Sequence, residues 1–357
     1  MPSFNIASIP ADGIGPEVIA AGIQVLQAVC ARHSDLQLNF THFDWGSDYY
    51  KQHGKMMPED GLEKLKSFDA IYFGAVGAPD VPDHITLWGL RLPICQGFDQ
   101  YANVRPTKIL PGISSPLRDV GVGDLDWVII RENSEGEYSG HGGRAHKGMP
   151  EEVGTEVAIF TRAGVMRIMR YAFEIAASRP RKMLTVVTKS NAQRHGMVMW
   201  DEIAEEVSCE FPHVSWDKML VDAMTVRMTL QPETLDTIVA TNLHADILSD
   251  LAGALAGSIG VAPTANIDPQ GRFPSMFEPI HGSAFDITGK GIANPVATFW
   301  TGAQMLQHLG LNEEAERLMQ AVEQVCEAGI MTPDVGGNAT TIEVTEAVCE
   351  AIRTANS

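Results

Sequence analysis

The stretch from Phe4 to Val18, "FNIASIPADGIGPEV", indicates the class of fold. It begins with a short apolar run typical of a buried strand, and Gly13 and Gly15 then lead into a segment whose apolar residues recur with helical spacing. The same order of elements continues with the strand "LQLNFTHFD", the helix "PEDGLEKLKS" and the strand "DAIYFGAVG". This alternation predicts an α/β fold in which largely parallel sheets are flanked by helices.

The two glycines of this stretch resemble the start of a dinucleotide-binding fingerprint, but Val18 stands where that motif needs its third glycine. Pro16 and Glu17 occupy the helix N-terminus, where the charge of Glu17 would repel a pyrophosphate. A tight turn that needs the backbone freedom of glycine explains the pair more simply. We therefore do not expect a standard Rossmann fold.

Length and composition restrict the classes of function. A chain of 357 residues is long enough for two domains or one large α/β unit. Its net charge of -19 argues against nucleic acid or an anionic membrane as a partner. The five cysteines lack CxxC spacing, the first residues do not resemble a signal peptide, and no apolar run is long enough to span a membrane. We expect a soluble cytoplasmic protein with reduced thiols.

The middle of the chain contains a glycine- and histidine-rich segment, "SGHGGRAHKG", for which we expect a polar loop. "TEVAIF" then predicts a strand, and residues 161–180 predict a helix that is capped by Thr161 and stopped by Pro180. "RKMLTVVTKSNA" predicts a buried strand that ends in polar residues, where α/β sheets usually bind their ligands. Three long helices are expected in the last hundred residues. Because we find no repeat or long linker, we expect any second domain to be an insertion into the first.

Two aspartates stand four residues apart in the apolar segment "NLHADILSDLAGALAGSIG". On a helix, Asp246 and Asp250 share one face, and their charges repel each other. With Asp222, from the apolar setting "MLVDAMTV", they could bind a hard cation such as Mg²⁺ or Mn²⁺. A solvated helix face explains the same spacing, and the spacing alone leaves both interpretations open.

Several basic residues follow apolar runs rather than lying on polar faces. Arg105 in "YANVRPTK" and Arg131 in "VIIREN" are suited to binding a carboxylate through two hydrogen bonds. Lys189 in "VVTKSN" could act as a general base, and the phenol of Tyr138 could donate a proton. A structural role stays open for each residue. We find neither a Ser-His-Asp arrangement nor zinc-ligand spacing among the histidines.

A set of motifs gives the whole chain a family resemblance. In order they are "DGIGPEV", "QYANVRP", "RENSEGEY", "TKSNA", "VDAM", "NLHADILSDLAG", "EPIHGSAFDITGKGIANP" and "GGNATT". Together they resemble the metal-dependent β-decarboxylating dehydrogenases, which include isocitrate, isopropylmalate, tartrate and D-malate dehydrogenases. The resemblance implies an isopropylmalate-dehydrogenase-like two-domain fold. Residues 1–100 and 257–357 would form the cofactor-binding domain, and residues 101–256 an inserted domain for metal, substrate and dimerisation.

The resemblance also implies a homodimer with shared active sites. Asp246 and Asp250 would bind Mg²⁺ or Mn²⁺ together with Asp222 of the partner subunit. Arg105 and Arg131 would bind substrate carboxylates. Tyr138 would be the acid, Lys189 of the partner subunit the base, and Asn191 would lie near the nicotinamide. A divalent cation would offset the repulsion between the two aspartates.

These residue types fit the oxidation of a 2-hydroxy acid. The hydroxyl proton must leave as hydride leaves C2, and a cation stabilises the resulting alkoxide. A carboxylate on C3 can then leave as CO₂. Lys189 would serve the first step, and Tyr138 would protonate the enolate in the last.

The cofactor is expected against "EPIHGSAFDITGKGIANP". The residues that the resemblance places there are Glu278, His281, Gly282, Ser283, Asp286 and Asn294. The carboxylate of Asp286 can accept hydrogen bonds from the ribose hydroxyls of NAD and would repel the 2′-phosphate of NADP, so we expect NAD. The resemblance also admits a monovalent cation as an activator.

Three positions depart from the family pattern. Ala11 replaces a common glycine, Phe285 replaces a common proline, and Cys95 stands where relatives usually have another substrate-binding arginine. Arg91, four residues earlier, could supply that guanidinium. Alternatively, the enzyme recognises a different C3 substituent.

The segment "LWGLR" places Trp88 and Arg91 where isopropylmalate enzymes need an apolar pocket. This favours the tartrate and D-malate branch, whose substrates carry small polar C3 substituents. Isopropylmalate or another C3-substituted malate is the second substrate class. A non-catalytic regulatory subunit of the same family is the remaining alternative.

Overall fold

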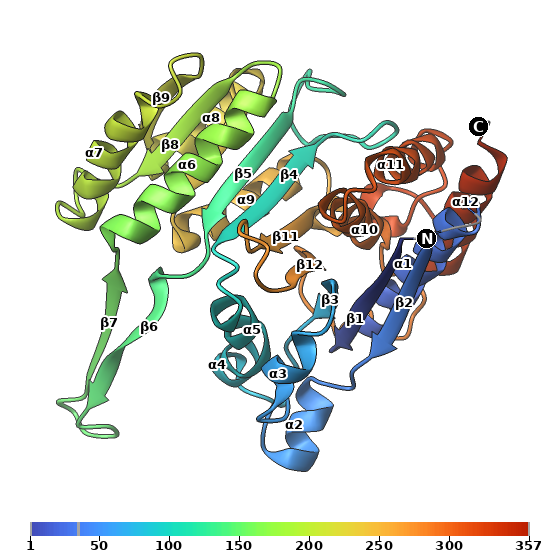
Figure 1. Cartoon of the computed structure of the whole chain (residues 1–357), viewed down its shortest axis with the longest axis horizontal. Helices are drawn as coiled ribbons and strands as arrows, with labels where there is room; N and C mark the ends of the chain where they lie inside the picture. Colours follow the sequence, from blue (N-terminus) through green and yellow to red (C-terminus); the bar gives the residue numbers. More distant parts are fainter. Residues whose placement is uncertain (1, 34–35, 356–357) are drawn as a thin grey trace.

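The computed structural model describes residues 2–33 and 36–355, and in them one ten-stranded sheet runs through the whole molecule (Figure 1). From one edge to the other its strands are β2 (Gln37–His42), β1 (Ser3–Ala11), β3 (Ala70–Ala75), β12 (Ser275–Pro279), β11 (Pro263–Ile267), β4 (Ala102–Lys108), β5 (Asp126–Glu132), β10 (Thr237–Ala240), β8 (Met183–Thr188) and β9 (Ser215–Leu220). The central pairings β12–β11, β11–β4 and β4–β5 are antiparallel. The other neighbours pair in parallel. The expected α/β fold with a largely parallel arrangement is therefore confirmed.

Helices cover both faces of this sheet (Figure 1). The longer ones are α1 (Gly15–Cys30), α6 (Arg162–Ser178), α7 (Gly196–Ser208), α8 (Val221–Leu230), α9 (Asn242–Leu255), α10 (Val296–His308), α11 (Asn312–Glu327) and α12 (Thr341–Thr354). Short helices α2 (Ser47–His53), α3 (Gly61–Leu65), α4 (Asp83–Thr86) and α5 (Leu92–Gly97) surround the end of β3, and a π-helical turn, η1 (Leu87–Arg91), joins α4 to α5. The predicted cap of α6 is confirmed, because Thr161 Oγ1 accepts a hydrogen bond of 2.9 Å from the backbone N–H of Gly164.

The core divides unequally between the two faces of the sheet. On one face, apolar residues from nearly every strand pack with α1, α6, α7 and α10 to α12 in one continuous cluster. On the other face there are two separate clusters, one with α8 and α9 and the other with α3 and α5. In β5, Val128 and Ile130 belong to the first face, and Trp127 and Ile129 to the second. This burial on both sides explains the continuous apolar run "WVII".

Between the two smaller clusters, the central strands carry polar side chains on the second face. The strand register aligns Asn266 of β11 with Asn103 of β4, and Asn103 with Arg131 of β5. The residues that alternate with them, Ala265 and Val104, pack into the continuous core on the first face. The middle of the second face is therefore a polar strip, bordered by α9 on one side and by η1 and α5 on the other.

A two-stranded ribbon of β6 (Gly136–Ala145) and β7 (Val153–Ile159) extends away from the body of the molecule (Figure 1). The strand expected from "TEVAIF" is confirmed, but the loop expected over "SGHGGRAHKG" is wrong, because His141 to Ala145 pair with β7. Most residues of the ribbon are exposed on both sides, so nothing selects the apolar alternation that marks a half-buried strand.

The predicted domain boundaries fall between neighbouring strands of the one sheet. Strands from residues 1–100 and 257–357 form the half that ends at β11, and strands from residues 101–256 form the half that begins at β4. The continuous core on the first face crosses this junction. The two-domain division stays a prediction.

The sequence predicted reduced cysteines and no membrane-spanning segment, and the described residues bear on both expectations. All five cysteines are free thiols. Within residues 2–33 and 36–355, no helix combines the length and the apolar character that crossing a membrane requires.

The turn between β1 and α1 accounts for the glycine pair. Gly13 has a φ of 58°, and a Cβ atom there would lie 1.9 Å from the carbonyl oxygen of Ser283. A Cβ on Gly15 would lie 2.0 Å from the carbonyl oxygen of Pro10. The backbone N–H of Ile14 donates a 2.8 Å hydrogen bond to that same Ser283 oxygen. The explanation as a tight turn is confirmed, and the turn supports the loop that follows β12.

We predict that Gly13→Ala destabilises the protein by roughly 3 kcal/mol, the sum of a positive φ and a steric clash with Ser283. Gly271→Ala is the matched control, because Gly271 also has a positive φ of 63°, but a Cβ atom there would meet nothing within 4 Å. It should cost only about 1 kcal/mol. Chemical denaturation measures both, and equal losses would contradict the clash.

Candidate active site

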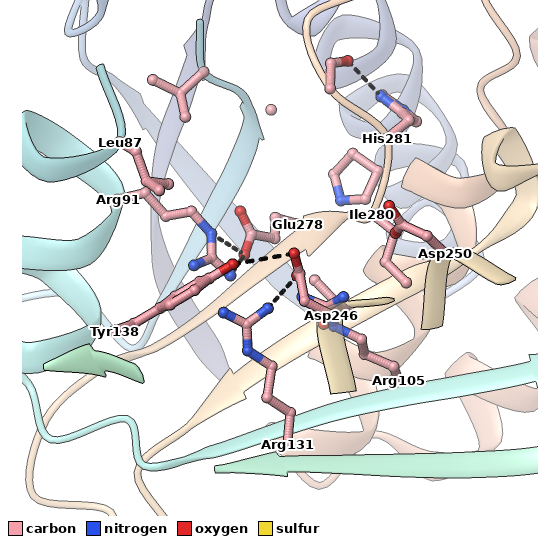
Figure 2. Close-up of a pocket in the computed structure, with 15 residues that line it drawn as sticks. Leu87, Arg91, Arg105, Arg131, Tyr138, Asp246, Asp250, Glu278, Ile280 and His281 are labelled. Carbon is pink, nitrogen blue, oxygen red and sulfur yellow. Dashed lines mark hydrogen bonds and ion pairs between the residues drawn. The ribbon is translucent and has the colours of Figure 1, made fainter. Parts of the chain in front are cut away.

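A pocket of about 210 Å³ opens on the polar strip of the sheet, between η1 and α9 (Figure 2). Its lining combines charged side chains with a smaller apolar wall of Val76, Leu87 and Ile280. The lining residues that the sequence predicted are Arg91, Arg105, Arg131, Tyr138, Asp246, Asp250, Glu278, His281 and Gly282. The structure therefore brings together most of the predicted site residues from six separate elements and the loops beside them.

Helix α9 presents the two aspartates to this pocket. The helix begins after Thr241, whose hydroxyl accepts a hydrogen bond from the backbone N–H of His244. Its apolar side, including Ala245 and Leu248, packs on the second face of the sheet. Asp246 and Asp250, one turn apart, share one face of the helix, as expected from their spacing, and both line the pocket.

The environments of the two aspartates differ. Burial opposes the charge of Asp246, but Arg131 and Arg105 outweigh it and lower the pKa of this carboxyl. For Asp250, burial and the charge of Asp246 raise the pKa. Among the residues that the structure describes, no cation forms an ion pair with Asp250. Asp250 therefore offers a carboxylate that a bound cation could neutralise.

Two buried arginines form the base of the pocket. Arg131 forms an ion pair with Asp246 Oδ1, and Arg105 Nη2 lies 3.3 Å from the same oxygen. Arg105 also donates from Nε to Asn103 Oδ1 at 2.7 Å and from Nη1 to Ser249 Oγ. Burial and the neighbouring charge of Arg131 lower the pKa of Arg105 to about 10. Two guanidinium groups that share one carboxylate leave positive charge for an anionic ligand.

Tyr138 reaches the same aspartate from the base of the ribbon (Figure 2). Its hydroxyl donates to Asp246 Oδ2 at 3.3 Å, and the guanidinium carbon of Arg131 lies 5.0 Å from the centre of its ring. Burial and the charge of Asp246 raise the pKa of the phenol. Tyr138 is therefore held in its protonated form, which suits a proton donor.

Arg91 enters the pocket from the end of η1 and is bound to Glu278 of β12. Arg91 Nε and Nη2 lie 2.8 Å and 2.6 Å from Glu278 Oε1, which also accepts a 2.8 Å hydrogen bond from Asn266 Nδ2. Burial opposes the charge on Arg91, but the charge of Glu278 outweighs it and raises the pKa of the guanidinium. The guanidinium of Arg91 is therefore charged, and these contacts fix the orientation of both side chains.

Cys95 does not line the pocket. It is fully buried among the apolar residues of α5 and the neighbouring strands, and this burial raises the pKa of its thiol to about 11. A neutral, buried thiol has no contact with a ligand in the pocket. Arg91 is therefore the arginine that this helical segment contributes to the site.

The loop after β12 forms another edge of the pocket through His281 and Gly282. Burial lowers the pKa of His281, so its ring is neutral. Its Nε2 is buried and has no hydrogen-bond partner among the described residues, as expected of an atom that awaits a ligand. Further along, Asn294 donates to Asp334 Oδ2 at 3.0 Å, and Asp286 is exposed. Ser283 holds the turn at Gly13 through its carbonyl oxygen.

Besides Ser283, Asp286 and Asn294 of the loop after β12, the predicted residues that do not line this pocket are Lys189, Asn191 and Asp222. Lys189, after β8, forms an ion pair with Asp222 at the start of α8, and Asn191 is exposed in the turn that follows β8. The chain therefore keeps the proposed base and the third proposed metal ligand together, outside the lining of the pocket that holds its own Asp246 and Asp250. Such a pair could be offered as a unit to the site of another subunit.

The donor set fits a divalent cation only in part. Across residues 2–33 and 36–355, no group of three His, Cys, Asp or Glu side chains is arranged to hold a metal ion. Asp246 and Asp250 supply two carboxylates in one pocket, and the repulsion between them is of the kind that a cation relieves. These two residues fit the proposed metal, with the third carboxylate left to a partner.

Sequence reasoning missed the polar residues beneath the pocket. Asn103 and Asn266 are fully buried and joined by a 2.7 Å hydrogen bond, Ser249 contacts Arg105, and Thr264 lines the pocket wall. A signal was present, because Asn103 and Arg105 alternate with Ala102 and Val104 in the manner of a strand with one polar face.

Comparisons with known proteins agree with this geometry. The family model described as isocitrate/isopropylmalate dehydrogenase matches residues 5–352. A probable tartrate dehydrogenase/decarboxylase of Agrobacterium vitis is 81% identical over 356 residues, which cover 100% of this chain and 99% of that protein. A decarboxylating D-malate dehydrogenase of Escherichia coli strain K12 is 51% identical and covers 99% of each chain.

A solved structure shows the same arrangement. The crystal structure of isocitrate dehydrogenase from Methylococcus capsulatus superposes with a TM-score of 0.88 at 34% identity, covering 98% of this chain and 100% of that one. The expected resemblance to the branch that includes tartrate and D-malate dehydrogenases is confirmed by the relatives. The chain belongs to the isocitrate/isopropylmalate dehydrogenase family.

Proposed function

We propose that this chain is an NAD- and divalent-metal-dependent dehydrogenase of small 2-hydroxy dicarboxylic acids of the tartrate or D-malate type, acting with or without decarboxylation. The observation that carries the proposal is the pocket in which Arg105 and Arg131 share one carboxylate beside a protonated Tyr138. The decarboxylating activity in the names of the relatives supports it.

The two arginines account for a dicarboxylic substrate. Both are nearly inaccessible to water, with 5% of Arg105 and 2% of Arg131 exposed, so their charges act in a medium of low polarity. A substrate carboxylate would accept hydrogen bonds from both guanidinium groups. With a volume of about 210 Å³, the pocket suits an acid of a few carbon atoms.

The acid and the base of the reaction come from different subunits in this proposal. Lys189 of the partner subunit would take the proton from the substrate hydroxyl, and NAD would accept the hydride from C2. Tyr138 would then deliver its phenolic proton to C3 after CO₂ has left. Its raised pKa keeps that proton available.

Asp246 and Asp250, with Asp222 of the partner subunit, would hold Mg²⁺ or Mn²⁺. When bound, the cation would stabilise negative charge on the substrate hydroxyl oxygen. Arg131 and Arg105 already keep Asp246 ionised, and this is the state that a ligand must have. A monovalent cation activator stays a prediction of the resemblance.

The cofactor would lie along the loop from Glu278 to Asn294. His281 offers an unpaired ring nitrogen there, and Asn294 is oriented by Asp334. Asp286 is exposed and would meet the ribose hydroxyls of NAD. Asn191 of the partner subunit would lie near the nicotinamide.

The shared site requires a homodimer. Lys189 and Asp222 contact each other and do not line the pocket of their own chain, which supports their contribution to a second copy.

The cytoplasmic location stays a prediction that rests on the cysteine pattern. The non-catalytic alternative had its support in Cys95, and the guanidinium of Arg91 in the pocket argues against that alternative.

The proposed function predicts NADH formation from D-malate or a tartrate in the presence of Mn²⁺ and NAD. Removal of the metal with EDTA should abolish the reaction, and added Mn²⁺ should restore it, because the proposed cation would stabilise negative charge on the hydroxyl oxygen. The absorbance of NADH measures the rate, with isopropylmalate and isocitrate as comparison acids. If none of these acids gives NADH formation although NAD binding is measurable, the proposal is contradicted.

The shared site predicts complementation between two inactive variants. Lys189→Met and Asp250→Asn should each abolish turnover. Chains of both kinds, mixed in equal amounts and allowed to exchange, should regain about a quarter of the unaltered activity, because half the dimers are mixed and each contains one intact site. The measurement is the rate of NADH formation after exchange.

The control mixes Lys189→Met with Asp222→Asn. Each chain would contribute both Lys189 and Asp222 to the site of its partner. Every site in the mixture would therefore lack either the lysine or the aspartate, and no activity should return. Recovery of activity in this control, or no recovery in the first mixture despite confirmed exchange, would show that Lys189, Asp222 and Asp250 are not divided between subunits as proposed.

A further inference from the structure

The strand of the ribbon that carries Tyr138 is irregular at its base. Gly136 pairs with Ile159, the next regular pair is His141 with Val157, and the register of β6 against β7 shifts between them. Tyr138 lies within this shift, outside the regular ladder of backbone hydrogen bonds. A bulge of this kind redirects a side chain at the expense of backbone pairing, so other contacts must hold the segment in one conformation.

Two contacts from the helical segment beside the pocket hold this bulge. Gln96 Nε2, from α5, donates a hydrogen bond of 3.3 Å to the carbonyl oxygen of Tyr138. The ring of Trp88, from η1, lies against Gly140, where a Cβ atom would be 2.6 Å from Trp88 Cη2. Gly140 also has a φ of 73°, so both its conformation and the close approach of the ring require glycine. One helical segment therefore fixes the backbone at Tyr138 and two residues beyond it.

The remaining contacts of Tyr138 involve its side chain alone. Its hydroxyl donates to Asp246, and its ring faces the guanidinium of Arg131. In Figure 2 the ring enters the pocket from the side of Leu87 and Arg91, which belong to η1. A shift of the bulge would carry the hydroxyl with it, and a misplacement of about 1 Å can slow a reaction by roughly 100-fold.

Neither Trp88 nor Gln96 lines the pocket, and both are exposed. They can therefore act on a bound acid only through the residues that they hold. Both come from residues 1–100, whereas the ribbon comes from residues 101–256, so the two contacts join the two halves of the predicted domain division.

We infer that Trp88 and Gln96 are positioning residues for Tyr138, and that they hold its phenol where it can protonate C3 of the decarboxylated substrate. This inference rests on the proposed function. In that step the phenolic O–H bond breaks, and a C–H bond forms at C3 with the electron pair that the departing CO₂ leaves behind. Transfer of hydride from C2 comes earlier and does not use the phenol. Loss of either contact should therefore slow protonation and spare hydride transfer.

The test follows NADH formation from D-malate by rapid mixing, with Mn²⁺ and NAD at saturation, in Gln96→Met and Trp88→Ala. The first turnover at each site forms NADH before the phenol acts, so its rate should equal that of the unaltered protein. Later turnovers must wait for protonation and should be roughly 10- to 100-fold slower, as for a displaced catalytic group. Trp88→Phe, which keeps an aromatic ring, should recover most of the loss.

Two matched controls separate these contacts from general effects of substitution. Gln52→Met alters an exposed glutamine of α2 and should leave both phases unchanged. Gly140→Ala would displace the ring of Trp88 and should slow only the later turnovers. Gly148→Ala is its control, because Gly148 lies in the turn between β6 and β7 with a φ of 81°, and a Cβ atom there would meet nothing within 4 Å.

Equal slowing of the first and later turnovers in Gln96→Met and Trp88→Ala would overturn the inference, because the loss would not be specific to protonation. Unchanged kinetics in both variants would also overturn it. If Trp88→Ala fails to fold, Gln96→Met decides the question, because its side chain is exposed.

Tyr138→Phe separates this inference from the function on which it rests. If Tyr138→Phe slows only the later turnovers and the variants of Trp88 and Gln96 do not, the inference alone is wrong. If Tyr138→Phe leaves the later turnovers unchanged, or if the unaltered protein oxidises none of the acids, the proposed function fails and the inference fails with it.

Discussion

The ion pair between Arg131 and Asp246 connects the centre of the sheet to helix α9, and the arrangement of the pocket depends on it. Arg131 is 2% exposed and comes from β5, so its charge must be met inside the protein. A buried pair of this kind adds little to stability over an apolar pair, but removing one partner leaves a buried charge at a cost of about 3–5 kcal/mol. The pair therefore fixes where α9 places Asp246, and through Asp246 it positions Arg105 and Tyr138.

The topology makes room for this charge. A continuous core covers the first face, while the second face has two separate cores with a polar strip between them. The strip coincides with the antiparallel strands β11, β4 and β5, where Asn266, Asn103 and Arg131 follow one another across the sheet. Each of these side chains is hydrogen-bonded to a neighbour or paired with Asp246. Apart from Arg131 Nε, which is buried without a hydrogen-bond partner among the described residues, these side chains form a paired network that can be rigid at low exposure.

Local sequence patterns were sufficient to predict many of the helices and strands, but not the contacts between them. Apolar runs and caps predicted β1, β3, β8 and the start of α6, because burial and capping act over a few residues. The ribbon was missed, because strands that are exposed on both sides carry no alternation. The four-residue spacing predicted that Asp246 and Asp250 share one face of a helix. It could not show whether that face is exposed to water or lines a pocket. The contacts of Arg91 with Glu278 join residues 187 positions apart, and no local pattern encodes such a pair.

The overall charge of the chain and the charge of the pocket have opposite consequences for an anionic substrate. A net charge of -19 repels a dianion at a distance, but salt screens that field beyond about 8 Å at physiological ionic strength. Inside the pocket, Arg105 and Arg131 act without such screening, because both are buried. Selection among anions must therefore be local: the arginines attract carboxylates, and Glu278 and Asp250 reject negative charge at the remaining walls. Since burial and the charge of Asp246 raise the pKa of Asp250, a cation at that wall would change both the charge and the affinity of the pocket. With the proposed metal bound, these acidic residues would therefore couple binding of the substrate to binding of the cation.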